Sequence, residues 1–401
     1  MFRLALAAMA AISPLQYGFA ALLAKEPASL TLLAVWIACQ AAGALPALHL
    51  VRRGRLGVRA CLAAGAALSG LGLATAAAAA HGPIALVGYA LLGGLGAGLV
   101  YGVCGEVVSS WYPDRPAARV GLITGAFGYG AVPLLVWAGI DPAATSTAFL
   151  VAAVLATGVI AAAARYLRLP PALWWPADVD PRSHALDAAR LRTTPEAAKQ
   201  FRLAQALRTR MLPALALILT CAGAVSVFDV IVVAGTGSWG ALALLVALNG
   251  AGRSVAMRRS EAFGRRRVLA AVLTALATGQ VLLATAVHGT GPTGDPLPGP
   301  AGTTGGALLW AGVVLAGLGG GAFYPLVASL VRELFGSERA GEIHAVVYSA
   351  KALAGAGAVA LALLALTAPA GALLAAAALA ALPALATPRL RIPGLPLTLP
   401  L

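Results

Sequence analysis

Twelve long apolar segments separated by short polar loops constrain this fold more than any other feature. Each is about 20 residues long, the length that a helix needs to cross the hydrocarbon of a bilayer. Of the 401 residues, 60% are hydrophobic and only 10% are charged, which excludes an ordinary soluble globule. The sequence therefore predicts an all-α membrane protein with 12 transmembrane helices. The segments lie near residues 3–23, 30–50, 59–80, 84–107, 120–139, 146–166, 212–233, 240–257, 268–288, 306–330, 343–366 and 369–387.

Basic residues are concentrated in alternate loops. One set of loops contains nearly all of the arginines that lie between the segments, whereas Lys25 is the only basic residue of the opposite set. An excess of arginine and lysine marks the cytoplasmic side of a membrane protein. We therefore expect a multi-pass protein of the plasma (bacterial inner) membrane with cytoplasmic N- and C-termini. Because the net charge of +14 is spread over many loops, we expect no nucleic-acid partner.

The chain also divides into two related halves. The motif Gly94-x-Gly96-x-Gly98-x-x-Tyr101 recurs as Gly317-x-Gly319-x-Gly321-x-x-Tyr324, and small residues at this spacing pack helices closely. A duplicated half predicts a substrate site between the halves, near the middle of the bilayer. We expect an N-terminal six-helix half over 1–166, a cytoplasmic linker over 167–211 and a C-terminal six-helix half over 212–401.

Two connecting segments carry further predictions. Within the linker, Pro195 and the following residues through Phe201 predict a short interfacial helix. The Gly/Pro-rich loop 289–305 accounts for the length difference between the halves, and we interpret it as a surface insertion without evident chemistry.

Two cations lie at or near the predicted membrane depth. Lys351 has no acidic residue within eight positions, and Arg253 ends the apolar run Ala241–Gly252. A cation at the centre of a membrane helix costs about 2.5–3.5 kcal/mol on insertion scales, so an unpaired one needs a function. Two such cations indicate that the missing anion is the substrate. Two alternatives remain: Arg253 extends to the cytoplasmic interface beside Arg258, and Lys351 pairs with a buried acid.

Asp229 and Glu106 are the acids considered for that pairing. Asp229 lies deep in the seventh segment, where it would neutralise Lys351 or Arg253, or bind a proton. Glu106 lies at the cytoplasmic end of the fourth segment, beside the loop that carries Arg115 and Arg119.

The cysteines and histidines are scattered singly, so the sequence predicts no metal site, cofactor or catalytic constellation, and we expect no enzyme.

The loop Ser260-Glu261-Ala262-Phe263-Gly264-Arg265-Arg266 resembles the loop motif of the major facilitator superfamily, Ser-Asp-Arg-x-Gly-Arg-Arg. Its first-half counterpart matches at Arg52, Gly54 and Arg55, but Val51 replaces the acidic residue. The resemblance implies the fold of that superfamily. It also implies a gating role for the six residues that match the motif, namely Arg52, Gly54, Arg55, Glu261, Gly264 and Arg265.

More narrowly, the chain resembles the oxalate/formate antiporter family. The resemblance rests on Gln16-Tyr17, on Gly94 to Tyr101 followed by Trp111-Tyr112-Pro113-Asp114-Arg115, on Gly125 to Ala131, and on Asn249 to Arg253. In that family an arginine of span 8 and a lysine of span 11 bind the dicarboxylate with help from aromatic residues. The resemblance implies a substrate site formed by Arg253, Lys351, Tyr17, Gln16, Tyr101, Tyr324 and Tyr129.

These observations predict a secondary active transporter that exchanges small organic anions, oxalate- or formate-like carboxylates, by alternating access. We expect a monomer in the lipid bilayer, with a small carboxylate as its partner and no cofactor. A proton-coupled monocarboxylate transporter is the alternative, although Asn249, which cannot titrate, occupies the slot of the aspartate in related monocarboxylate transporters. Efflux of cationic drugs is a third hypothesis, but it would require a buried acid rather than two cations.

Overall fold

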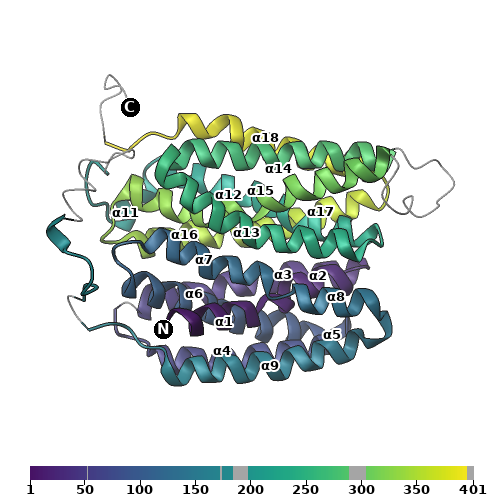
Figure 1. Ribbon diagram of the computed structural model, residues 1–401, viewed down its shortest axis with the longest axis horizontal. Helices are drawn as coiled ribbons and strands as arrows, with labels where there is room; N and C mark the ends of the chain where they lie inside the picture. Colours follow the sequence, from purple (N-terminus) through teal and green to yellow (C-terminus); the bar gives the residue numbers. More distant parts are fainter. Residues whose placement is uncertain (52, 172–173, 184–196, 289–303, 395–401) are drawn as a thin grey trace.

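A computed structural model of the protein describes residues 1–51, 53–171, 174–183, 197–288 and 304–394 (Figure 1). Arg52, the predicted helix start at Pro195 and residues 289–303 of the predicted insertion lie outside this part of the chain. The described residues are predominantly helical and contain no β-strand. Twelve of the described helical segments are long and apolar enough to cross a membrane, which confirms the predicted all-α class and number of spans.

The first six spans form the lower layer of Figure 1 and the last six form the upper layer. The first layer contains α1 (Phe2–Ala11), η1 (Pro14–Gly18), α2 (Phe19–Leu22), α3 (Pro27–Pro46), η2 (Ala47–Val51), α4 (Val58–Ala78), α5 (Gly82–Ile84), η3 (Ala85–Gly93), α6 (Gly94–Trp111), α7 (Pro116–Tyr129), α8 (Val132–Ile140), η4 (Pro142–Ala144) and α9 (Thr145–Tyr166). The second contains α12 (Met211–Gly235), α13 (Trp239–Phe263), α14 (Arg265–His288), α15 (Thr304–Phe335), α16 (Ala340–Ser349), α17 (Lys351–Ala365), α18 (Pro369–Ala386) and η5 (Thr387–Arg389).

The linker lies at one end of the bundle, which we call the linker end. Its short helix α11 (Leu203–Leu207) is at the left of Figure 1, at the same end as the start of α1. The predicted interfacial helix up to Phe201 is wrong, because the described residues of that segment are not helical and the helix begins at Leu203. The Phe201 amide instead donates to the Phe335 carbonyl at 2.9 Å, and the two rings pack edge to face. These tertiary contacts hold the segment against α15 in a conformation that local propensity does not predict.

Within each half, the repeated glycines bring an equivalent pair of helices into close contact, α6 with α3 in the first half and α15 with α13 in the second. A Cβ atom on Gly98 would lie 2.3 Å from the Gln40 carbonyl oxygen, and one on Gly321 would lie 2.0 Å from the Asn249 carbonyl oxygen. Only glycine permits such an approach, which is the packing expected for small residues in membrane helices. As a result, α6 packs directly on the α3 backbone at Gln40, and α15 packs in the same way on the α13 backbone at Asn249.

Two spans are interrupted where they carry site residues. Pro14–Gly18 forms a π-helical turn inside the first span, and this turn contains Gln16 and Tyr17. The eleventh span breaks between α16 and α17 at Ala350, directly before Lys351. At this break the Ala350 carbonyl accepts from the Ala354 amide at 3.1 Å, and the Thr220 hydroxyl of α12 lies 3.3 Å from the same oxygen. Breaks of this kind in membrane helices are typical of binding sites.

Candidate functional site

Arg253 is buried at the interface of the two halves. Its side chain is 1% exposed, so the alternative of an arginine that extends to the membrane interface is wrong. Nη1 donates to the Thr124 carbonyl oxygen of α7 at 2.9 Å, and Nη2 donates to Tyr17 Oη and to Asn249 Oδ1, each at 3.0 Å. Tyr17 Oη in turn donates to Asn249 Oδ1 at 3.0 Å. The guanidinium is therefore fixed by neutral groups from α13, η1 and α7.

Asn249 extends this network to α12. Its Nδ2 donates to Ser226 Oγ at 3.1 Å, while its Oδ1 accepts from Arg253 and Tyr17. From the sequence, Asn249 is notable only as a position that cannot titrate. In the structure it orients the arginine.

Lys351 is held in the same way from the first half. The side chain is 3% exposed, and Nζ donates to Gln16 Oε1 at 3.0 Å and to Gln40 Oε1. Gln16 comes from the π-helical turn η1 and Gln40 from α3, so both partners of this lysine are neutral amides on helices of the opposite half.

The two cations share aromatic neighbours. The Phe127 ring centroid lies 5.7 Å from Arg253 Cζ and 5.5 Å from Lys351 Nζ. The Tyr324 centroid lies 5.2 Å and 5.6 Å from the same two atoms. Tyr348 is 5.8 Å from Lys351 Nζ and stacks on Tyr101 with centroids 5.4 Å apart. Rings at these distances attract a desolvated cation through their negative faces.

Neither cation is neutralised by an acid in the described part of the chain. All hydrogen bonds of Arg253 and Lys351 go to amide, phenol or carbonyl oxygens. Asp229, an acid considered for this pairing, instead accepts from Gln280 Nε2 of α14 at 2.6 Å. Glu106 accepts from Ser110 Oγ at 3.4 Å and lies outside the hydrogen-bond shells of both cations. The predicted alternative in which a buried acid pairs with Lys351 is therefore wrong.

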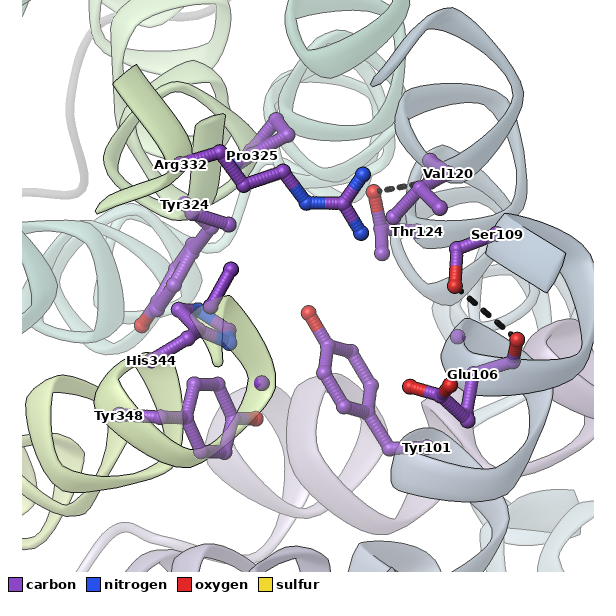
Figure 2. Close-up of a pocket in the computed structure, with 14 residues that line it drawn as sticks. Tyr101, Glu106, Ser109, Val120, Thr124, Tyr324, Pro325, Arg332, His344 and Tyr348 are labelled. Atoms are coloured by element: carbon purple, nitrogen blue, oxygen red, sulfur yellow. Dashed lines mark hydrogen bonds between the residues drawn. The ribbon is translucent and has the colours of Figure 1, made fainter. Parts of the chain in front are cut away.

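A cavity of about 90 Å³ lies beside this cluster, between helices of the two halves (Figure 2). It is lined by Tyr101, Thr124, Tyr324 and Tyr348 of the cluster and by Glu106, His344 and Arg332. The lining helices α6 and α7 belong to the first half, and α15 and α16 belong to the second. A water molecule needs about 10–15 Å³ of such volume, so the cavity accommodates several waters beside the cluster.

Most of the predicted site residues converge here. Arg253, Lys351, Gln16 and Tyr17 are joined by the hydrogen bonds described above, and the rings of Tyr101 and Tyr324 lie within the same cluster. Tyr129 differs: it is 40% exposed at the end of α7, where its ring packs against Gly250. Sequence reasoning did not assign Gln40, Thr124, Phe127, Asn249 or Tyr348 to the site.

The loop motif residues lie at the linker end. Gly54 and Gly264 have φ angles of 67° and 84°, which glycine adopts readily, and they form the turns before α4 and α14. Arg265 donates to Glu333 of α15 at 3.2 Å, and Arg266 lies 3.5 Å from the same carboxylate. Glu261 is exposed in the last turn of α13, and Arg55 is exposed beside Gly54. In the first half, Arg53 forms an ion pair with Glu342 of α16 and so connects the two halves.

Comparison with known proteins identifies the architecture. The family model described as Major Facilitator Superfamily matches residues 3–359 of the chain. No curated protein sequence is significantly similar.

Three solved structures illustrate the similarity of fold. A POT family transporter in complex with 5-aminolevulinic acid superposes with a TM-score of 0.68 at 13% identity, covering 97% of this chain and 96% of the other. The proton:xylose symporter XylE gives a TM-score of 0.64 at 15% identity, covering 96% and 95%. The human organic anion transporter MFSD10 (TETRAN) gives a TM-score of 0.59 at 16% identity, covering 96% of each chain. At these identities the similarity extends to the fold alone.

Proposed function

Since this chain belongs to the major facilitator superfamily, we propose that it is a secondary active transporter that exchanges small carboxylates of the oxalate or formate type. The observation that carries the proposal is the pair of buried cations, Arg253 and Lys351, whose partners in the described chain are all neutral. Leaving a cation inside a membrane protein without a counter-charge is costly. A carboxylate that binds between Arg253 of α13 and Lys351 of α17 supplies that charge.

Unused donors beside the cations support the same ligand chemistry. Arg253 Nε and Gln40 Nε2 are buried and have no acceptor in the described part of the chain. Buried donors are rarely left unpaired, and a carboxylate offers acceptor capacity only. Arginine is suited to a planar carboxylate because its donors form a rigid fork, and lysine adds a compact charge. We infer that a small dianion is held with one end toward each cation.

The same charges favour exchange. Without an anion, two positive side chains that share the Phe127 and Tyr324 rings repel each other in a medium of low dielectric, so reorienting the empty site is costlier than reorienting the loaded one. A carrier with this property moves one anion inward as it moves another outward. The site lies between the halves, so rocking of the halves about it would expose it to each side in turn.

We further propose how this carrier is arranged in the cell. Residues 1–166 and 212–401 act as the two rocking bodies, and 167–211 connects them on the cytoplasmic side. The basic loops at the linker end favour this orientation, with the protein acting as a monomer in the plasma membrane. The cavity behind Tyr101 and Tyr348 is then the cytoplasmic route to the site.

Proton-coupled monocarboxylate transport is the second candidate. Asp229 favours it because it is a buried acid on α12, the helix whose Ser226 accepts from Asn249. In this case an imposed pH gradient would drive uptake into vesicles that contain no exchange partner, and Asp229→Asn would abolish the dependence on pH.

Thermal stabilisation of the detergent-purified protein by a panel of mono- and dicarboxylates tests the proposed site. We expect a stabilising ligand for the wild type and its loss in Arg253→Ala and Lys351→Ala, because a ligand that binds only the folded state raises the midpoint. Stabilisation that survives both substitutions would move the site elsewhere. No stabilisation of well-folded protein by any carboxylate would exclude this class of substrate.

A further inference from the structure

Asp229 of α12 and Gln280 of α14 form a buried polar pair outside the cation cluster. Asp229 is 1% exposed and Gln280 is fully buried. Gln280 Nε2 donates to Asp229 Oδ1 at 2.6 Å. Two buried oxygens of the pair, Asp229 Oδ2 and Gln280 Oε1, remain without a donor in the described part of the chain.

A single proton on the Asp229 carboxyl group would give both of these oxygens a hydrogen-bond partner. An ionised carboxylate and an amide oxygen are both acceptors only, so neither can satisfy the other. A protonated carboxyl group carries an O–H donor, and the other unused acceptor of the pair is Gln280 Oε1. The acid and the amide then form two reciprocal hydrogen bonds, with the amide N–H donating to Oδ1 and the acid O–H donating to Oε1. Every polar atom of the pair gains a partner, as is usual for buried groups.

No cation of the surrounding helices neutralises Asp229 instead. In the described chain, the only hydrogen-bond or ionic partner of Asp229 is Gln280 of α14. The helices that pack on α12, together with α14, nevertheless contain many charged groups. The charged or titratable residues on those helices are Arg253, Arg258, Arg259 and Glu261 on α13, Arg265, Arg266, Arg267 and His288 on α14, Tyr324, Arg332 and Glu333 on α15, Glu342, His344 and Tyr348 on α16, and Lys351 on α17. An ionised Asp229 would therefore be a buried charge without a counter-ion, which is strongly unfavourable.

We propose that Asp229 and Gln280 form a proton-binding site, in which Asp229 carries the proton on Oδ2 and donates it to Gln280 Oε1. The site is separate from the two cations, but α12 connects it to them. One turn before Asp229 on this helix, Ser226 accepts the hydrogen bond from Asn249, which in turn accepts from Arg253. The proposal does not depend on which anion the carrier moves.

Infrared difference spectroscopy of the wild type against Asp229→Asn tests the protonation directly. Near neutral pH, we expect the wild type to show the C=O stretch of a protonated carboxylic acid that is absent from the variant. If the lost bands are instead the two stretches of an ionised carboxylate, the proposal is overturned. Asparagine can form the same reciprocal pair with Gln280, so we expect this variant to fold.

A second variant, Gln280→Met, removes the proposed partner and retains the acid. The carboxylic C=O band should persist and move to higher frequency, because its hydrogen bonds to the amide are lost. An unmoved band would overturn the pairing with Gln280, and this comparison does not require Asp229→Asn to fold. Both variants should keep the carboxylate-induced stabilisation of the wild type, so the outcome here is distinguishable from a failure of the proposed substrate.

Discussion

Lys351 is the residue whose replacement should most clearly separate binding from folding. Lys351→Gln retains hydrogen-bonding capacity toward Gln16 and Gln40 but removes the charge. A hydrogen bond to a charged group contributes about 1.5–3 kcal/mol, so we expect carboxylate binding to weaken about 10- to 100-fold. Isothermal titration or thermal shift would measure this change. Lys25→Gln, in an exposed loop, is the control and should bind like the wild type. Equal binding by all three proteins would remove Lys351 from the site.

Phe127 should contribute through its ring, because it faces both cations. Phe127→Leu keeps an apolar side chain but loses the cation–π contacts, each of which contributes about 0.5–2 kcal/mol. We expect carboxylate affinity to change by about 2- to 30-fold, with a shift in the apparent dissociation constant as the readout. Tyr129→Phe is the control on the same helix, since Tyr129 is 40% exposed and its ring packs on the backbone of Gly250. An effect of Tyr129→Phe as large as that of Phe127→Leu would contradict this assignment.

Some members of the site can be predicted from the sequence and others cannot, for physical reasons. Lys351 is recognisable because a charge inside an apolar helix is rare and costly. Phe127 is not, because an aromatic residue in a membrane helix is usual and its neighbours are far away in the chain. Gln40 and Thr124 also escape prediction: the lysine bound by Gln40 is 311 positions away, and Thr124 contributes only its backbone oxygen to Arg253.

At the scale of helices, the glycine repeat places the polar residues of the site. Gly321→Ala would drive a methyl group against the Asn249 carbonyl oxygen and separate α15 from α13. Overpacking costs about 1–3 kcal/mol, so we expect a lower thermal midpoint, and weaker carboxylate binding because Asn249 orients Arg253. Gly158→Ala on α9 is the matched control, since a methyl group added there would meet no atom within 4 Å. If both variants melt like the wild type, the close packing is not needed for stability.

The helix pattern is predictable where apolar length decides it, and unpredictable where tertiary contacts decide it. Hydropathy locates all twelve spans, because a bilayer leaves the helix as the only structure that satisfies the backbone of a single segment. The linker helix is misplaced by sequence reasoning because contacts of Phe201 with Phe335 determine that segment. The partner of Arg265 is likewise missed, because Glu333 lies 68 positions further along the chain.

For the whole molecule, the Arg53–Glu342 ion pair should stabilise contact of the halves at the linker end. Arg53 is 41% exposed, and exposed pairs contribute about 0–1 kcal/mol, so loss of the pair should shift the balance of conformations by up to about fivefold. Arg53→Glu adds repulsion between two carboxylates to this loss. A cysteine introduced at Ser109, in the cavity wall, would report the shift as faster thiol labelling. The double reversal Arg53→Glu/Glu342→Arg should restore the original rate. Equal rates in the single and double variants would contradict a direct pairing.

Counterflow in proteoliposomes tests the central claim most directly. Purified protein is reconstituted, the vesicles are loaded with unlabelled oxalate or formate, and uptake of the labelled anion is followed against empty vesicles. We expect rapid uptake only into loaded vesicles and its loss in Lys351→Gln. Uptake that is equal in empty vesicles, or that Lys351→Gln leaves intact, would contradict carboxylate exchange at the two buried cations.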